Sequence, residues 1–192
     1  LGDALGIKNS SIPIAVNRTG VLAGKTVVSV TAGHKTSYAV CSDGSVASWG
    51  DDNYGQLGTG RIVSGSRQEV PVAVSATGAL ASRSVVSVSA GNGFCFALCS
   101  DGVVASWGLN GNGQLGNRST SHSGTPVLVD RSGVLAGRIV TSVSAGSGSG
   151  MALCSDGTLA SWGHNGLGQL GNNSATDRTW PVPVTSTGAL AG

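Results

Sequence analysis

A valine-rich segment that ends in Ala-Gly occurs three times along this chain, and this repetition limits what the chain can fold into. The segment reads Val-Val-Ser-Val-Thr-Ala-Gly at residues 27–33, Val-Val-Ser-Val-Ser-Ala-Gly at 85–91 and Val-Thr-Ser-Val-Ser-Ala-Gly at 140–146. Repetition at a nearly constant spacing is typical of architectures in which one supersecondary unit stacks against copies of itself. The sequence therefore predicts a tandem-repeat protein.

Three further blocks follow each valine-rich segment at fixed distances: Cys-Ser-Asp-Gly, Ala-Ser-Trp-Gly and Gly-Gln-Leu-Gly. All variation in length falls between Gly-Gln-Leu-Gly and the next valine-rich segment, which marks that stretch as a loop. We predict one repeat domain over residues 1–192, with units of about 1–56, 57–114 and 115–169 and a partial unit at 170–192. The positions expected to hold the repeated structure are Trp49, Trp107, Trp162, Gly33, Gly91, Gly146, Asp43, Asp101, Asp156, Gly44, Gly102, Gly157, Gln56, Gln114 and Gln169.

Each unit is expected to form four antiparallel β-strands. The valine-rich segment supplies the first strand, because β-branched residues suit a pleated, half-buried surface. The second and third strands are joined through Asp-Gly, which favours a type I′ turn with positive φ at both central residues. The fourth is a short apolar segment with proline, which suits an outer edge. Its copies are 70–74, 126–129 and 181–184, and residues 12–16 predict an extra N-terminal outer strand.

Side-chain size alternates along the expected second strand. In the first unit one face is bulky, with Tyr38 and Val40, and the other is small, with Ala39 and Cys41. The later units repeat this alternation, with Phe96, Leu98, Met151 and Leu153 on the bulky face and Ala97, Cys99, Ala152 and Cys154 on the small face. Both faces are apolar, so both must be covered, and the bulky face of one sheet can pack against the small face of the next. This pattern predicts the blades of a β-propeller.

The order Ala-Gly, apolar strand, Asp-Gly, Trp-Gly and Gly-Gln-Leu-Gly resembles the regulator-of-chromosome-condensation repeat over essentially the whole chain. The resemblance implies an all-β propeller, usually of seven blades, whose members exchange nucleotide on a small GTPase, dock on chromatin, inhibit enzymes or sense ultraviolet light. Where that family often has histidine, this chain has Thr36, Phe94 and Ser149. The acidic loop cluster, the Lys-rich tail and the extra tryptophan cluster of some members are absent from the sequence. These departures argue against nucleotide exchange and light sensing. The amino-acid sequence of the repeated blocks, such as Cys-Ser-Asp-Gly, looks more like that of bacterial repeat proteins.

Charge and hydropathy exclude two classes of partner. The chain has 11 Lys and Arg and 9 Asp and Glu, and the basic residues are scattered singly, so no basic stripe predicts binding to nucleic acid. No apolar run approaches the roughly 18 residues that a membrane helix needs. The chain begins at Leu1 rather than Met, which is expected of a processed product or a fragment of a longer chain. We expect an extracellular or cell-surface location rather than a cytoplasmic one.

No set of residues in the sequence predicts catalysis, a cofactor or a metal site. The three histidines, His34, His122 and His164, lie at different phases of the repeat and lack the spacing of metal ligands. Asp51 and Asp52 have no matching carboxylates in the later units, so turn formation is favoured over calcium binding. The cysteines at the repeated position are expected to be buried thiols, because stacked sheets hold them about 10 Å apart, beyond the reach of a disulfide. We therefore predict that the protein is not an enzyme.

Three blades do not close a propeller, which needs about four to eight. The two end sheets are therefore expected to leave one bulky and one small apolar face uncovered, and such faces favour association. We predict a non-catalytic protein-interaction or assembly module that binds protein, either as a homo-oligomer, as a filament or as part of a longer repeat array. The alternative is a propeller that inhibits or regulates a partner enzyme or GTPase through its loop face, where Tyr54 and Trp180 are the possible contacts.

Overall fold

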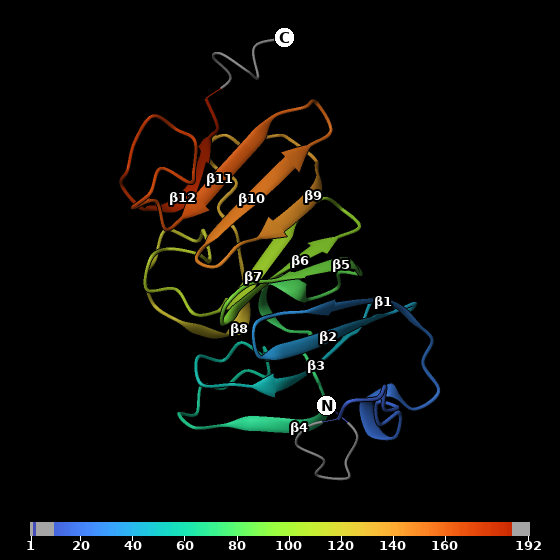
Figure 1. Ribbon diagram of the computed structural model, residues 1–192. Helices are drawn as coiled ribbons and strands as arrows, with labels where there is room; N and C mark the ends of the chain where they lie inside the picture. Colours follow the sequence, from blue (N-terminus) through green and yellow to red (C-terminus); the bar gives the residue numbers. More distant parts are fainter. Residues whose placement is uncertain (1, 3–9, 186–192) are drawn as a thin grey trace.

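Three four-stranded antiparallel sheets make up the structure (Figure 1). The computed structural model describes residue 2 and residues 10–185. The first sheet contains β1 (Val27–Ala32), β2 (Thr36–Cys41), β3 (Val46–Asp51) and β4 (Arg67–Ala73). The second contains β5 (Val85–Ala90), β6 (Phe94–Cys99), β7 (Val104–Gly108) and β8 (Ser123–Leu128). The third contains β9 (Val140–Ala145), β10 (Ser149–Cys154), β11 (Leu159–Gly163) and β12 (Arg178–Pro183).

The three sheets lie one upon another in chain order, and the predicted all-β blade architecture is confirmed (Figure 1). The described residues contain no α-helix, only the short 3₁₀ turns η1 (Gly20–Leu22) and η2 (Gly78–Leu80). The first strands of the sheets lie side by side, because Thr31 Oγ1 donates to the Val88 carbonyl at 2.8 Å and the Ala145 amide donates to Ser89 Oγ at 2.9 Å. The fourth strands therefore form the far edge of each sheet. The three sheets do not close into a ring.

Neighbouring sheets pack bulky face against small face, as the alternation in the second strand predicts. Tyr38 and Val40 of the first sheet share a core cluster with Ala97 and Cys99 of the second. In the next interface the Phe96 ring lies 5.2 Å from the Trp162 ring, centroid to centroid, in an edge-on arrangement. These side chains are almost fully buried, so burial of apolar area between sheets is the main stabilising contribution of the stack.

The blade tryptophans join each sheet to the one before it. Trp107 Nε1 donates a hydrogen bond of 2.8 Å to the Gln56 carbonyl, and Trp162 Nε1 donates one of 2.9 Å to the Gln114 carbonyl. Both indoles are fully buried, and a buried N–H needs such a partner. The Gly-Gln-Leu-Gly block of one unit is thus hydrogen-bonded to the tryptophan of the next.

The prediction of a type I′ turn at Asp-Gly was wrong. Gly44 has a φ of 79°, but Asp43 is not among the residues with positive φ. The Gly44 amide donates to the Cys41 carbonyl, and the Cys41 amide donates to the Ser45 carbonyl. This is a three-residue loop, in which a type I turn is followed by glycine in the left-handed region. The loop includes Ser42, so it is one residue longer than a type I′ hairpin allows.

The extra N-terminal outer strand predicted at residues 12–16 does not form. These residues are described, and they have no strand assignment. Each fourth strand in the structure pairs with the third strand of its own sheet, and no third strand precedes residues 12–16 among the described residues. Apolar character alone was therefore a misleading signal, because strand formation also requires a partner for the backbone.

The sequence units and the sheets are out of phase by one strand. The predicted unit boundaries after residues 56 and 114 each fall between the third and the fourth strand of a sheet. Residues 57–114 therefore supply β4 of the first sheet together with β5, β6 and β7 of the second.

Among the described residues, none of the helical segments could span a membrane.

We expect Trp107→Ala to lower the free energy of unfolding by about 3–5 kcal/mol, as for other large buried aromatic side chains. The substitution removes a fully buried ring that connects two sheets. Urea unfolding followed by circular dichroism measures the change. Trp180→Ala is the control, since Trp180 is only half-buried, and a change of less than about 1 kcal/mol is expected there. An equally small change for Trp107→Ala would contradict the role assigned to this indole.

Candidate interaction surfaces

The Ala-Gly glycines lie where the inner strands of neighbouring sheets approach each other closely. A Cβ on Gly91 would lie 2.5 Å from the Gly146 carbonyl oxygen, and one on Gly33 would lie 3.1 Å from the Gly91 carbonyl oxygen. The first distance leaves no room for a side chain, and the second would require the neighbouring backbone to shift by a few tenths of an ångström. These repeat positions therefore hold the stack together and present no group to a ligand.

The hairpin aspartates hold their own turns and also the linkers between sheets. Asp101 Oδ1 accepts a hydrogen bond from the Val103 amide, and its Oδ2 forms an ion pair of 2.9 Å with Arg83 Nε. The same pair recurs as Asp43 with Lys25 and as Asp156 with Arg138. Sequence reasoning missed these bases, although a basic residue precedes each valine-rich segment. Hydrogen bonds from Ser45 and the nearby Lys25 lower the pKa of Asp43 to about 2.

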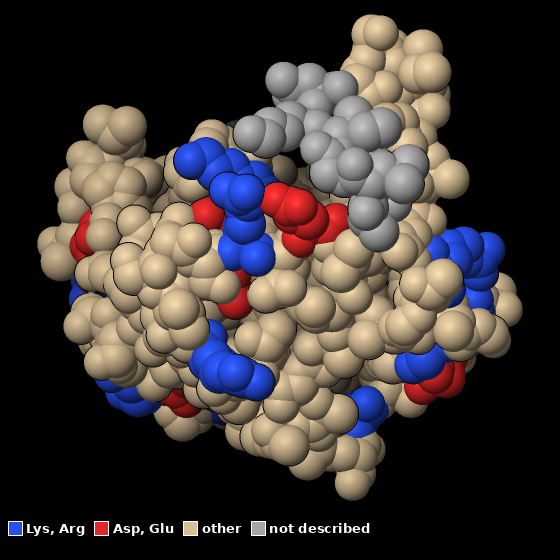
Figure 2. Space-filling view, turned by 90° about the horizontal axis from the view of Figure 1, so that it is seen from below, with Lys and Arg blue, Asp and Glu red and all other residues tan. Residues whose placement is uncertain are grey.

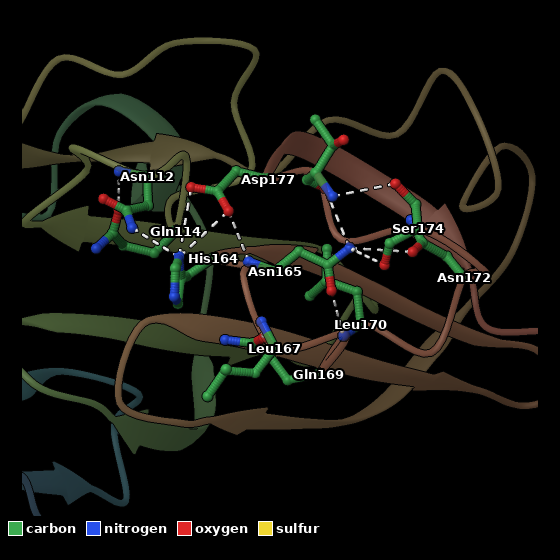
Figure 3. A network of polar contacts seen from close by, with 11 residues as sticks. Asn112, Gln114, His164, Asn165, Leu167, Gln169, Leu170, Asn172, Ser174 and Asp177 are labelled. Atoms are coloured by element: carbon green, nitrogen blue, oxygen red, sulfur yellow. Dashed lines mark hydrogen bonds and ion pairs between the residues drawn. The ribbon is translucent and has the colours of Figure 1, made fainter.

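Buried asparagines organise the loops at the Gly-Gln-Leu-Gly end. Asn165 Oδ1 accepts from the Leu170 amide, while its Nδ2 donates to Asn172 Oδ1 and to the Ser174 carbonyl (Figure 3). Asn110 makes the corresponding bonds in the second sheet. Each amide uses both its donor and its acceptor groups, so these side chains replace backbone pairing inside the loop.

Asp52 occupies this asparagine position in the first sheet. It is almost fully buried, and its Oδ1 accepts from the Leu57 amide at 3.0 Å. Asp52 lines a pocket of about 310 Å³ together with Thr59, Ser66 and Gln68. An ionised carboxylate cannot donate a hydrogen bond as Asn165 does, and burial raises the pKa of Asp52. The first loop is therefore held less completely than the other two.

A polar junction connects the loops of the second and third sheets. Asn112 Nδ2 lies 3.0 Å from His164 Nδ1, and that nitrogen lies 3.2 Å from Asp177 Oδ1 (Figure 3). Asp177 Oδ1 also accepts from the Asn165 amide at 2.7 Å. The His164–Asp177 pair thus contacts the Asn112 side chain and the Asn165 backbone amide, and this geometry supports positioning of the two loops.

Of the two aromatic residues proposed as loop contacts, Tyr54 lies in a loop, whereas Trp180 lies within strand β12 and not in a loop. Tyr54 is 41% exposed, and its ring packs edge-on against His122 at 5.3 Å. Trp180 lies half-buried on β12, with the Arg118 guanidinium 5.2 Å and the Arg178 guanidinium 6.0 Å from its ring centroid. On the face that Figure 2 draws, Lys and Arg side chains lie in separate groups, several of them beside Asp or Glu.

The outer faces of the end sheets differ from each other. On the third sheet Met151 and Leu153 are 39% and 40% exposed, whereas the corresponding Phe96 and Leu98 are 0% and 6% exposed. The bulky end face is thus open, as predicted. Val30 on the first sheet is 72% exposed and lines an apolar pocket of about 550 Å³.

The expectation of a fully uncovered small face was wrong. Leu22, Val16 and Val21 pack over Cys41 and Ala47 on that face. These three residues belong to the N-terminal segment, which is described at residue 2 and residues 10–26. One repeat later, the equivalent Val74, Ala79 and Leu80 pack in the core beside the second sheet. The pocket beside Val30 is the part of this face that remains accessible.

The family description "Regulator of chromosome condensation (RCC1) repeat" matches residues 43–98 and 101–153, and a second pattern of the same description matches 27–56, 85–114 and 140–169. The chain belongs to the RCC1 repeat family. The matches include each Asp-Gly and Trp-Gly block and the first two Gly-Gln-Leu-Gly blocks, and they end at residue 169, before β12 of the third sheet.

Several proteins with RCC1 repeats resemble this chain. It is 36% identical to the ultraviolet-B receptor UVR8 of Arabidopsis thaliana over 87% of its length, and 31% identical to the E3 ubiquitin-protein ligase HERC2 of Homo sapiens over 94%. The chain spans 36% of the receptor and 4% of the ligase. Among solved structures, Prp20p from Saccharomyces cerevisiae matches 84% of this chain and 39% of its own, with a TM-score of 0.74 and 20% identity. That likeness shows the shared RCC1 propeller fold.

We expect Asp52→Asn to stabilise this RCC1 array by about 1 kcal/mol at neutral pH, the typical net contribution of one hydrogen bond. Because the folded-state pKa of Asp52 is raised, its carboxylate destabilises the fold increasingly as pH rises from about 4 through that raised pKa. The gain should therefore disappear at low pH, where the carboxyl is protonated in both states.

Urea midpoints measured across this pH range test the prediction. Asn165→Asp is the matched control with the opposite sign, because it removes the Nδ2 donor from a loop that uses it. A lower midpoint for Asp52→Asn than for the unaltered protein at neutral pH would rule out the proposed deficit in the first loop.

Proposed function

We propose that this RCC1 array is a non-catalytic protein-interaction module that assembles through its open sheet faces, including with copies of itself. The observation that carries the proposal is the open bulky face of the third sheet, where Met151 and Leu153 are exposed. The equivalent side chains of the other two sheets are buried against a neighbouring sheet. A face with the composition of an internal interface is suited to bind another protein surface.

The named activities of the relatives support protein binding in general. Prp20p is described with binding properties toward Gsp1p and histones, and in another structure Kap60 is bound to it. UVR8 is named a receptor and HERC2 a ubiquitin ligase. These activities differ from one another, while the propeller fold is shared, so a partner must be inferred from the surfaces of this chain.

The second candidate is an effector that binds a partner enzyme or GTPase through its loop face. Trp180 favours it, because a half-buried indole with two guanidinium groups within 6.0 Å of its ring centroid can bind an aromatic or acidic surface. Arg178 Nε is buried and has no hydrogen-bond partner among the described residues. Under this reading Trp180→Ala would abolish binding to the partner and leave self-association unchanged.

Sedimentation velocity over a series of micromolar concentrations tests the assembly proposal. We expect the weight-average sedimentation coefficient of the chain to rise with concentration, and Met151→Asp to prevent the rise because a charge would be buried without a partner. Leu167→Asp is the matched control, since Leu167 is an apolar side chain 91% exposed on a loop. A chain that stays monomeric at every concentration would contradict self-assembly.

A further inference from the structure

The two internal interfaces show how a bulky face and a small face fit together. In each, an aromatic side chain from the second strand points edge-on at the tryptophan of the next sheet: Tyr38 at Trp107, with 6.3 Å between centroids, and Phe96 at Trp162, with 5.2 Å. Met151 holds the position of Tyr38 and Phe96 on the third sheet, where it is exposed. A thioether also packs well against an aromatic ring.

The small face of the first sheet offers the surface against which such a bulky side chain would pack. Val88 is 7% exposed beside Trp107, but the equivalent Val30 is 72% exposed. Val30 lines the apolar pocket with Ala39 and Trp49. In the other two sheets the corresponding place is filled by the bulky side chains of a neighbour. The pocket therefore matches the face that the third sheet exposes.

We propose that the bulky face of β10 in one copy docks on the small face of the first sheet in a second copy, with Met151 in the pocket beside Trp49. This inference rests on the proposed self-association and specifies its contact. Because the two faces are different, the contact is heterologous: each copy has one bulky and one small face, and association has a direction.

The N-terminal segment competes with such docking. Gly2 packs on the Trp49 indole as Gly58 packs on Trp107, and the Asn17 amide donates to the Gly2 carbonyl as the Ser75 amide donates to that of Gly58. The third sheet has an equivalent glycine, Gly171, whose carbonyl accepts from the Thr185 amide. If a docking copy reproduced the internal interface, its Gly171 would pack on the Trp49 indole, where Gly2 now lies.

The N-terminal segment must therefore move aside when the second copy binds. The third sheet of the docking copy then makes equivalent contacts with Trp49. Docking also buries Met151 and Leu153, which are exposed in the single chain, so it gains buried apolar area. The segment thus weakens association without preventing it. Gly2→Ala should strengthen association several-fold, because a Cβ there would lie 2.8 Å from Trp49 Nε1 and loosen the segment.

A mixing experiment with two variants of the full chain tests the contact. Met151→Asp blocks the bulky face, and Val30→Asp blocks the small face; both residues are exposed in the single chain, so neither change should prevent folding. Each variant alone lacks one half of the contact and should sediment as a monomer. An equimolar mixture should form a one-to-one dimer, because each variant keeps the face that the other lacks, and growth should stop there.

The possible outcomes separate this inference from the broader proposal. If Val30→Asp associates like the unaltered chain while Met151→Asp does not, two bulky faces meet each other, and the inference falls although self-association stands. If both variants associate like the unaltered chain, the contact lies elsewhere and the inference falls. Gly2→Ala without stronger association would overturn the competing role of the N-terminal segment.

Discussion

The arrangement of the stack depends on the insertion of each tryptophan under the closing block of the preceding unit. The indole N–H of Trp107 is buried and donates to the Gln56 carbonyl, and Gly58 lies against the same ring. A Cβ on Gly58 would lie 2.9 Å from Trp107 Nε1, and its φ of +70° also favours glycine. One contact thus explains why tryptophan and glycine recur together. Gln56 contributes only its backbone carbonyl to this contact, and its side chain holds the preceding loop by accepting from the Tyr54 amide.

Features with a local signal were predictable from the sequence. The alternation of Phe96 with Ala97 gave the two faces of β6, and the spacing of the blocks gave the order of strands. The turn after Cys41 could have been assigned by counting Ser42 into the loop. The failure at residues 12–16 has a different cause, because strand formation there depends on a pairing partner that the local sequence does not reveal. The cover that Leu22 provides on the first sheet is non-local in the same way.

The candidate surfaces were less predictable than the fold. Tyr54 and Trp180 were predicted as loop contacts, but Trp180 lies on β12, and the Arg118 guanidinium beside it comes from a loop of the second sheet, which no local pattern indicates. The loop face also uses buried amides such as Asn165 to hold its own backbone. Because many polar side chains of these loops bond to one another, we place the proposed binding sites at the apolar ends.

The offset between sequence unit and sheet has a consequence for how the chain unfolds. Because residues 57–114 contribute strands to two sheets, one sequence unit cannot melt without breaking β-pairing in its neighbour as well. Repeat proteins in which each unit contacts its neighbours only through side-chain interfaces can lose terminal units one at a time. Here the strand pairing stays inside each sheet, but backbone bonds such as that from the Val85 amide to the Gly44 carbonyl cross between sheets. These bonds add to the side-chain interfaces, so the sheets should melt together as one cooperative body.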